Sequence, residues 1–408
     1  MESSVLMKAV IDDTVYVAQG VGYLPQGREF SVFQPERVEY HPFCDDFGPM
    51  CLSSVIAFIE QLENEILLNP RSRIVYMVSA GRRSLTNAIF LLGAYMVLKL
   101  GIKASDVSDC FDWVDESSTE SYRDATYSRG GFRLTLDDCW RGLERGRALS
   151  WVQASADGEH WGMINIEEYR HYDSPFNGDF HEVVPGKFVA FKGPRDLGDA
   201  AFQDGGLGCR TFSPAAYADI FADDFRVAAV VRLNEAEYDG AAFEARGIRH
   251  HDLEFDDCTC PPDRVVAAFF AVADAAIAQG RAVAVHCRAG LGRTGTLIAL
   301  WLMRREGFTA REAMGWLRIM RPGSVIGKQQ RYLCAVEAAR GVATMGAPLA
   351  TSGADSEAEE ADSDESSSEL AGSGGLASAA AGSGRALGEE VASGALRREA
   401  ARWKVMSS

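Results

Sequence analysis

Two stretches of the chain share one pattern of hydrophobic and polar positions. Residues 281–286 form a short apolar run that predicts a buried strand, and residues 294–305 form a longer, mostly apolar segment that predicts a helix. A further helix is predicted over residues 309–320, which end just before a proline. The loop at residues 287–293 is therefore expected to connect the end of a strand to the start of a helix.

The same pattern occurs in the first half of the chain. Residues 73–78 predict a strand and residues 85–99 predict a helix. Placing residue 73 on residue 281 superposes the two segments without a gap, and Ser79 then falls on Cys287 while Leu85 falls on Arg293. Such self-similarity predicts a duplicated domain. The alternative is that any strand, loop and helix of an α/β protein look alike.

We therefore expect an α/β protein with two similar domains and a tail. Turn-forming residues at 172–179 indicate the boundary, which assigns residues 1–170 to the first domain and 171–345 to the second. Residues 346–408 are rich in Ala, Gly, Ser and acids, and residues 355–369 hold eight carboxylates without Lys or Arg. Such a segment cannot bury enough apolar surface to order itself, so we expect a disordered tail.

Composition narrows the classes of function. Of the 408 residues, 47% are hydrophobic, and the formal net charge is -17. This charge argues against broad nucleic-acid binding and suits cationic peptide partners. Nine cysteines without paired C-x-x-C motifs indicate a reducing compartment, and we expect neither a metal nor a cofactor. The first residues lack a signal-peptide pattern, and the apolar stretch at residues 88–98 is too short for a bilayer, so we expect the nucleus or cytoplasm and no membrane partner.

The loop from His286 to Gly295 carries the candidate chemistry. Cys287 and Arg293 are separated by five residues, and glycines among them let successive backbone N–H groups turn inward. The following helix adds the positive end of its dipole, so a dianionic phosphate fits this cradle. Arg293 can bind two phosphate oxygens through its planar guanidinium. The residues expected to line the cradle are Arg288, Ala289, Gly290, Leu291 and Gly292.

In this cradle Cys287 is the candidate nucleophile. The positive field favours the thiolate, which can attack phosphorus without help from a base. Thr294 could donate its hydroxyl to the sulfur, and His286 is expected to form a hydrogen bond within the loop. The alternative is a buried cysteine beside a helix-capping loop.

Two further steps need other side chains. A leaving alkoxide needs a proton, and the candidates are Asp256 and Asp257, in a turn-rich stretch about thirty residues before Cys287. Gln329 and Gln330 could hold the water that hydrolyses a phosphocysteine, since an amide orients water without carrying charge. By themselves, aspartates in a loop and a pair of glutamines can equally be solvated surface residues.

Taken together, these motifs resemble the dual-specificity phosphatases of the cell-division-cycle-fourteen family. His286–Gly295 resembles the signature of that family, and Arg321–Gln330 resembles its glutamine loop. The resemblance covers roughly residues 30–340 and includes five more stretches: Asp46–Pro49, Asn87–Tyr95, Tyr122–Tyr127, Val184–Phe191 and Val231–Asn234.

The resemblance implies tandem phosphatase-like domains of which only the second is catalytic. It favours Asp257 over Asp256 as the acid, and it implies hydrolysis of phosphoserine, phosphothreonine and phosphotyrosine esters. The implied preference is phosphoserine followed by proline, with a basic residue further on, at sites made by cyclin-dependent kinases. Roles in mitotic exit, cytokinesis or cilia, and places such as the nucleolus, spindle pole or centrosome, are likewise implied only by resemblance. The resemblance also implies an acidic groove between the domains that would bind the basic residue. Its candidate carboxylates are Glu167, Glu168 and Asp173, and Asp196 and Asp199 are further candidates.

Three positions depart from the family pattern. Arg288 stands where Lys is usual, Lys328 where Pro is usual, and Cys258 where Gly is common.

Two other functions compete with a protein phosphatase. Phosphoinositide phosphatases have two basic residues in a similar loop, whereas this chain has Arg288 but then Leu291. A non-catalytic phosphoprotein-binding module would be expected to lack Cys287, the arginine or the acid.

Overall fold

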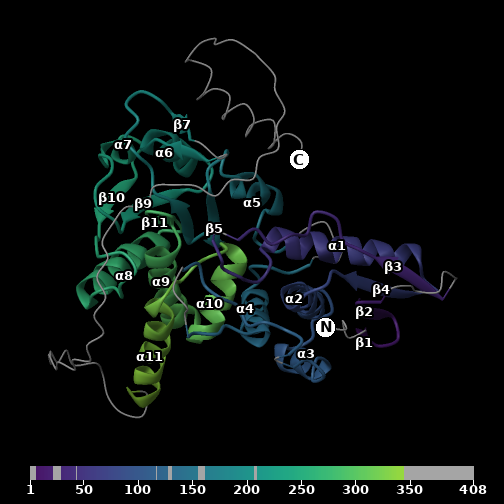
Figure 1. Ribbon diagram of the computed structural model, residues 1–408. Helices are drawn as coiled ribbons and strands as arrows, with labels where there is room; N and C mark the ends of the chain where they lie inside the picture. Colours follow the sequence, from purple (N-terminus) through teal and green to yellow (C-terminus); the bar gives the residue numbers. More distant parts are fainter. Residues whose placement is uncertain are drawn as a thin grey trace, which may run out of the picture.

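The structure is a computed structural model, which describes residues 6–21, 29–42, 44–115, 117–126, 131–154, 161–205 and 209–343. The tail predicted at 346–408 and Tyr127 of the quoted motif lie outside the described residues. Two α/β domains lie side by side, each built around its own sheet (Figure 1). The predicted α/β architecture with two domains is confirmed.

The first domain has a four-stranded sheet in the order β1-β2-β4-β3. Strand β4 is parallel to both of its neighbours, whereas β1 is antiparallel to β2. Helix α2 is buried from Leu85 to Leu98 and forms the centre of the domain. The elements are β1 (Leu6–Ile11), β2 (Val15–Gln19), β3 (Phe30–Phe33), α1 (Leu52–Leu68), β4 (Arg73–Val78), α2 (Arg82–Leu98), α3 (Ala104–Cys110) and α4 (Leu136–Ala148).

The second domain has a five-stranded sheet in the order β10-β9-β11-β6-β5. Strand β11 lies in its middle, parallel to β9 and β6, and all six of its residues are buried. Its strands are β5 (Phe180–Val184), β6 (Phe188–Lys192), β9 (Val227–Arg232), β10 (Arg249–Asp252) and β11 (Ala282–Cys287), with a separate hairpin of β7 (Phe202–Asp204) and β8 (Arg210–Phe212). Its helices are α5 (Ile166–Asp173), α6 (Pro214–Asp223), α7 (Ala241–Glu244), α8 (Asp263–Ile277), α9 (Gly292–Trp301), the π-helical turn η2 (Leu302–Glu306), α10 (Ala310–Met320) and α11 (Lys328–Ala343).

Most predicted elements are confirmed, with shifted ends. Strand β4 has the predicted bounds, and β11 is shifted by one residue from the predicted 281–286, so that it ends at Cys287. Helix α9 begins at Gly292, two residues before the predicted start, so Arg293 lies in its first turn. Helix α10 begins at Ala310, one residue after the predicted start, because Thr309 is its N-cap and forms a reciprocal capping box with Glu312.

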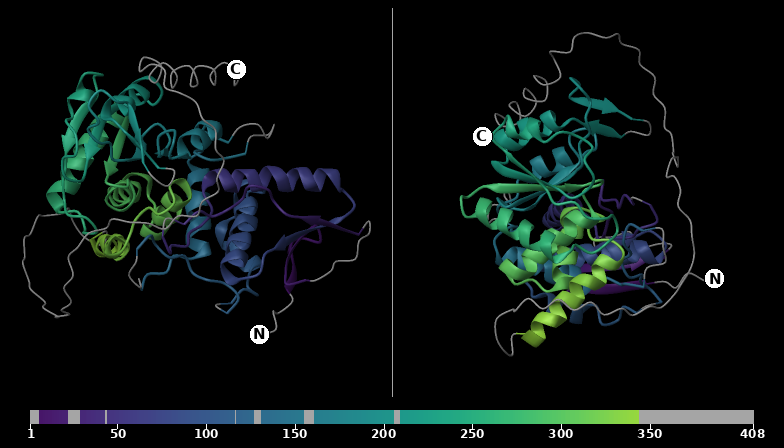
Figure 2. Two further views of the ribbon diagram at one scale, coloured as in Figure 1. Left: turned by 45° about the horizontal axis from the view of Figure 1, so that its top comes forward. Right: turned by 90° about the vertical axis from the view of Figure 1, so that its left-hand side faces the viewer.

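The two domains share one hydrophobic core, which includes α4 of the first domain and α10 of the second. The two helices approach closely because glycines face the partner: a Cβ at Gly142 would lie 2.7 Å from the backbone nitrogen of Trp316. The indole of Trp316 also donates to the Val183 carbonyl at 2.9 Å. Figure 2 shows the yellow-green helices of the second domain against the blue helices of the first.

Among the described residues, no helix is long and apolar enough to cross a membrane.

Candidate active site

The candidate nucleophile lies where the central strand meets a helix. Cys287 is the last residue of β11 and is 3% exposed, and the four residues after it lead into α9. Gly290 has a φ of +70°, and a Cβ at this position would lie only 2.0 Å from the Phe191 carbonyl oxygen. Any residue other than glycine would therefore push the loop away from β6.

External donors hold the carbonyl groups of this loop. Arg321 donates to the carbonyl oxygens of Ala289 and Gly290, each at 3.0 Å, and the backbone nitrogen of Gly193 donates to the Arg288 carbonyl at 3.1 Å. In a trans peptide the N–H points opposite to the C=O. The N–H groups of the next three residues therefore point away from these donors, which is the arrangement that a phosphate cradle requires. We call residues 287–293 the phosphate loop.

Arg293 connects the phosphate loop to the predicted acid. Its Nη1 donates to the carbonyl oxygens of Phe255, at 2.9 Å, and Leu233, at 3.3 Å. Its Nε lies 3.1 Å from Oδ1 of Asp257, an ion pair without a hydrogen bond. The Asp257 side chain is 59% exposed, so it lies at the mouth of the site. Asp256 instead lines a different cavity, so the structure brings Asp257 to the arginine.

His286 and Thr294 occupy the buried side of the phosphate loop. Nδ1 of His286 lies 3.0 Å from the Cys287 carbonyl oxygen, and Nε2 lies 2.7 Å from the Tyr238 hydroxyl. The predicted hydrogen bond within the loop is thus confirmed. Burial lowers the pKa of His286 to about 3, so the ring is neutral and holds the loop in place. The Thr294 hydroxyl is buried without a hydrogen-bond partner, which leaves its proton for a group in the cradle.

The two candidate glutamines have different surroundings. Gln329 is fully buried; its Nε2 donates to the Thr259 carbonyl at 3.0 Å, and its Oε1 would lie 3.0 Å from a Cβ at Gly292. It therefore lies between the turn that carries Asp257 and the phosphate loop. The amide of Gln330 instead accepts from Arg318 at 2.7 Å and donates to Gly327 at 3.1 Å. The Oε1 of Gln329 also accepts from the backbone nitrogen of Ile326 at 3.2 Å, and of the pair it is Gln329 that lies beside the phosphate loop.

A groove of about 700 Å³ begins beside the phosphate loop and continues between the domains. It is lined by Arg288, Ala289 and Leu291, by residues of the first domain such as Glu39, and by the end of α5. This is the seam that sequence reasoning expected to be acidic.

The predicted carboxylates lie at different places relative to this groove. Asp173, at the end of α5, lines the groove, but Glu167 and Glu168 do not. They lie in the first turn of α5, where Asn165 caps the helix and Glu167 pairs with Arg170 at 2.7 Å. Asp173 lies about one and a half helical turns further along α5. Asp196 and Asp199 are also absent from its lining.

Other carboxylates line the groove that sequence reasoning did not select: Glu39, Asp46, Asp179 and Glu237. Of these four, only Asp46 could have been selected from the sequence, because it begins a stretch that resembles the family.

Asp173 is held in its charged form. Burial acts to raise the pKa of Asp173, but the hydrogen bond from His181 and the nearby positive charges outweigh it and lower the pKa. Asp173 is therefore ionised at neutral pH, and its side chain is 42% exposed.

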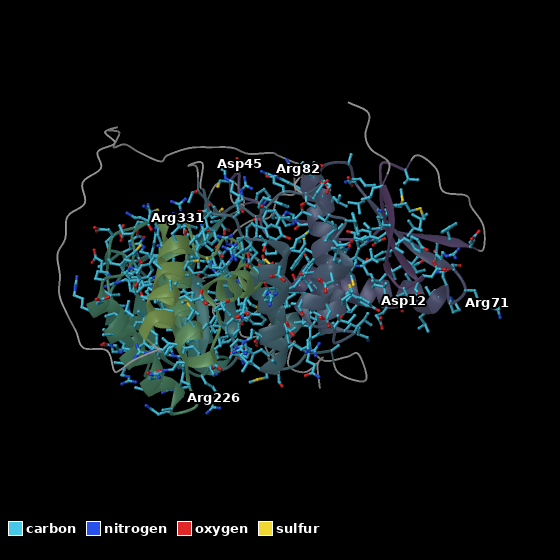
Figure 3. The ribbon with its side chains drawn as sticks, turned by 90° about the horizontal axis from the view of Figure 1, so that it is seen from below. Asp12, Asp45, Arg71, Arg82, Arg226 and Arg331 are labelled. Atoms are coloured by element: carbon cyan, nitrogen blue, oxygen red, sulfur yellow. The ribbon has the colours of Figure 1, made fainter. Side chains whose placement is uncertain are left out.

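The first domain has a counterpart of this site without its reactive groups. A cavity of about 680 Å³ is lined by Ser79, Arg83 and Ser84, at the end of β4 and the start of α2. Arg83 pairs with Glu120 at 3.0 Å and lies 3.8 Å from Asp45. Figure 3 labels Asp45 and the neighbouring Arg82 close together at one edge of the molecule.

Comparisons with known proteins agree with two related halves. Residues 11–146 match a family model described as dual specificity protein phosphatase, N-terminal half, and residues 212–307 match one described as polymorphic toxin system, DSP-PTPase phosphatase. The chain is 35% identical to human dual specificity protein phosphatase CDC14C, over 72% of this chain and 63% of the relative. It is 34% identical to the tyrosine-protein phosphatase CDC14 of Saccharomyces cerevisiae, over 79% of this chain and 59% of the relative.

The chain thus spans about three fifths of the length of these two curated relatives. Among solved structures, the active form of Tk-PTP is similar at 26% identity, with a TM-score of 0.32, over 40% of this chain and 97% of that one.

The two matched family regions do not reach the stretch around residue 171, so the predicted boundary between the domains stays a prediction.

Proposed function

The chain resembles the CDC14 dual specificity phosphatases across both domains, and we propose that it is a protein phosphatase that acts through a phosphocysteine on Cys287. Its substrates would be phosphoserine, phosphothreonine and phosphotyrosine esters in proteins. The observation that carries this proposal is the phosphate loop, in which Cys287 ends β11, Arg293 lies in the first turn of α9, and outside donors hold the three carbonyls of residues 288–290. A nuclear or cytoplasmic location stays a prediction.

In the first step the phosphate would bind in the loop, with its oxygens on the backbone N–H groups and on Arg293. The Cys287 thiolate attacks phosphorus, the P–O bond to the substrate breaks, and the leaving oxygen takes a proton from Asp257. The ion pair between Asp257 and Arg293 supports this assignment, because it joins an exposed carboxylate to the arginine of the phosphate loop.

In the second step water would attack the phosphocysteine. Asp257, now ionised, accepts a proton from the water, and Gln329 orients that water from its place between the acid and the loop. The S–P bond breaks, and the free hydroxyl of Thr294 stabilises the departing thiolate. The neutral His286 takes no proton in either step and serves to position the loop.

The test of the enzyme uses Cys287→Ser. We expect this variant to lose turnover of p-nitrophenyl phosphate and of phosphopeptides but to keep phosphopeptide binding, since the cradle remains. Measurable hydrolysis by the variant would show that the nucleophile lies elsewhere. Inositol phosphates form a further arm of the assay, and faster release of phosphate from them than from peptides would favour a lipid phosphatase.

We further propose a preference for phosphoserine followed by proline, with Lys or Arg two or three residues later. Proline has a fixed φ and would bind in extended form at low entropic cost, and the groove offers it Tyr40, Pro42 and Leu291. The basic residue would contact Asp173, which is ionised and partly exposed in the groove. A partly exposed ion pair contributes about 1 kcal/mol, or roughly fivefold in kcat/KM, and less in high salt.

Two carboxylates on one helix give a matched test of the groove. We expect Asp173→Asn to lose about fivefold in kcat/KM for peptides with the basic residue and nothing for peptides without it. Glu168→Gln, which removes the same charge from α5 outside the groove, should change neither value. Equal effects of the two variants would reject Asp173 as the contact, and equal rates on proline and alanine peptides would reject the proposed preference for proline.

A further inference from the structure

The strand beside the central one ends in a lysine. Lys192 is the last residue of β6, and in the parallel pairing of β6 with β11 its partner is Cys287. Alternate residues of a strand share one face, so Lys192 lies on the face of Phe188 and Ala190. Those two residues pack in the same hydrophobic core as Cys287. Because neighbouring strands lie about 4.8 Å apart, the lysine side chain begins beside the proposed nucleophile, on the same face of the sheet.

Direct contacts hold this end of β6 against the phosphate loop. A Cβ at Gly290 would lie 3.1 Å from the backbone nitrogen of Lys192. The next residue, Gly193, donates its backbone N–H to the Arg288 carbonyl at 3.1 Å. A Cβ at Gly193 would lie only 2.6 Å from the Cys287 carbonyl oxygen. Backbone packing on the loop therefore fixes the position of Lys192.

Lys192 and Arg288 line the groove and keep hydrogen-bond donors for a ligand. The ammonium of Lys192 donates to the Arg210 carbonyl at 3.2 Å, which leaves two of its three N–H donors. Arg195 of the same groove is instead paired with Glu237 at 3.1 Å. Within the part of the chain that the structure describes, neither Lys192 nor Arg288 forms an ion pair. Two cations at the phosphate-loop end of the groove are thus available to an anion.

We propose that Lys192 and Arg288 form a second anion site beside the phosphate cradle, which binds a second negatively charged group of a phosphopeptide. The inference rests on the proposed function and narrows its substrate class to phosphoserine peptides with a further phosphate or carboxylate nearby. The phosphate loop itself has Leu291 where a second cation could stand, and the neighbouring strand provides that cation instead. The planar guanidinium can bind two oxygens of the anion, and the ammonium adds a compact charge.

The opposite wall of the groove favours a peptide over an inositol headgroup. Glu39 and Asp173 line the same groove, and Asp173 is ionised. A peptide can present an anionic group to Lys192 and a cationic one to Asp173. An inositol polyphosphate carries negative charge alone and would meet these carboxylates as like charges, which is unfavourable.

The experiment measures binding to Cys287→Ser by isothermal titration calorimetry. The probes are phosphoserine-proline peptides with Ala, Glu or a second phosphoserine one or two residues before the phosphoserine, or two residues after it. We expect Glu at one of these positions to tighten binding about fivefold over Ala, and a phosphate to do so by at least as much. The gain should shrink in high salt. Failure of every phosphopeptide to bind would refute the proposed function, and the second site with it, whereas equal binding of all the peptides would overturn the second site alone.

Two lysine variants, each made together with Cys287→Ser, test the assignment. Lys192→Gln should lower the ratio of dissociation constants for the Ala and Glu peptides from about five to about two or less. Lys103→Gln removes the same charge from an exposed position before α3 and should keep the ratio of the parent. A ratio that survives Lys192→Gln, or that falls equally in Lys103→Gln, would overturn the proposal. Inositol bisphosphate whose binding depends on Lys192 more strongly than that of the peptides would overturn the choice of a peptide.

Discussion

Arg321→Lys tests whether the phosphate loop is shaped by a single buried arginine. The guanidinium is 3% exposed and donates to the carbonyls of Ala289 and Gly290 and to Asp179, each at 3.0 Å. It also lies 3.0 Å from Nδ1 of His181. Lysine keeps the charge, but its single ammonium cannot span both carbonyls and the carboxylate.

The expected loss follows from these contacts. A hydrogen bond to a charged group contributes about 1.5–3 kcal/mol, so losing one or two of them should lower the free energy of unfolding by about 3 kcal/mol. The released carbonyls of Ala289 and Gly290 can then rotate, and their peptide N–H groups rotate with them. We expect inorganic phosphate to bind at least about tenfold more weakly, which corresponds to about 1.4 kcal/mol.

Arg318 provides the matched control. It is 2% exposed and donates to the carbonyls of Ser324 and Val325 and to Gln330, but not to the phosphate loop. Arg318→Lys should lower stability by a similar amount and weaken phosphate much less. Urea unfolding gives the stability, and inhibition of p-nitrophenyl phosphate hydrolysis gives the phosphate affinity. If both variants weaken phosphate equally, or neither does, Arg321 does not shape the cradle.

Three further variants test other parts of the site. Asp257→Ala should slow phosphoserine peptides by about 10²–10⁴-fold at mildly acidic pH and aryl phosphates far less, because a phenolate leaves without a proton; a larger loss in Asp256→Ala would reverse the assignment. His286 takes up a proton near pH 6.5 when unfolded but only near about 3 when folded, so stability is full above pH 6.5 and falls as the pH drops from there. The loss should reach about 2 kcal/mol at pH 5, and His286→Asn should remove it; an unchanged pH slope in urea unfolding would contradict this. Ser79→Ala should leave kcat unchanged, and a large loss would show that the first domain takes part in catalysis.

The phosphate loop could be predicted because its parts are adjacent in the sequence. A strand, small residues and a helix within residues 281–305 fix where Cys287 and Arg293 lie. In the structure β11 is shifted by one residue and α9 begins two residues early, while the predicted end of the helix falls in the π-helical turn η2. The choice of Asp257 over Asp256 required the resemblance, since both are exposed residues in one turn. The ion pair to Arg293 distinguishes them only after folding.

The groove could not be predicted in the same way because its walls come from distant parts of the chain. Glu39 belongs to the first domain and Glu237 to the loop after β9, and only packing brings them to the end of α5. Glu167 and Glu168 were selected for their nearness to the boundary in sequence, but the direction of α5 decides that only Asp173 reaches the groove. Arg321 was likewise known only as the first residue of a motif, and its bonds to the phosphate loop depend on tertiary structure.

The two halves differ at the loop more than their shared pattern suggests, and this difference argues for an inert first domain. When residue 73 is placed on residue 281, Arg82 falls on Gly290, yet α2 already begins at Arg82 whereas α9 begins two positions later, at Gly292. In the first copy, the two residues that correspond to positions 290 and 291 of the phosphate loop are therefore already helical. Gln19 donates to the carbonyls of Ser79 and Gly81, at 2.6 and 3.0 Å, and closes what remains of the loop. The prediction of an inert first domain therefore rests on the backbone as well as on the absence of a cysteine and an arginine at the equivalent positions.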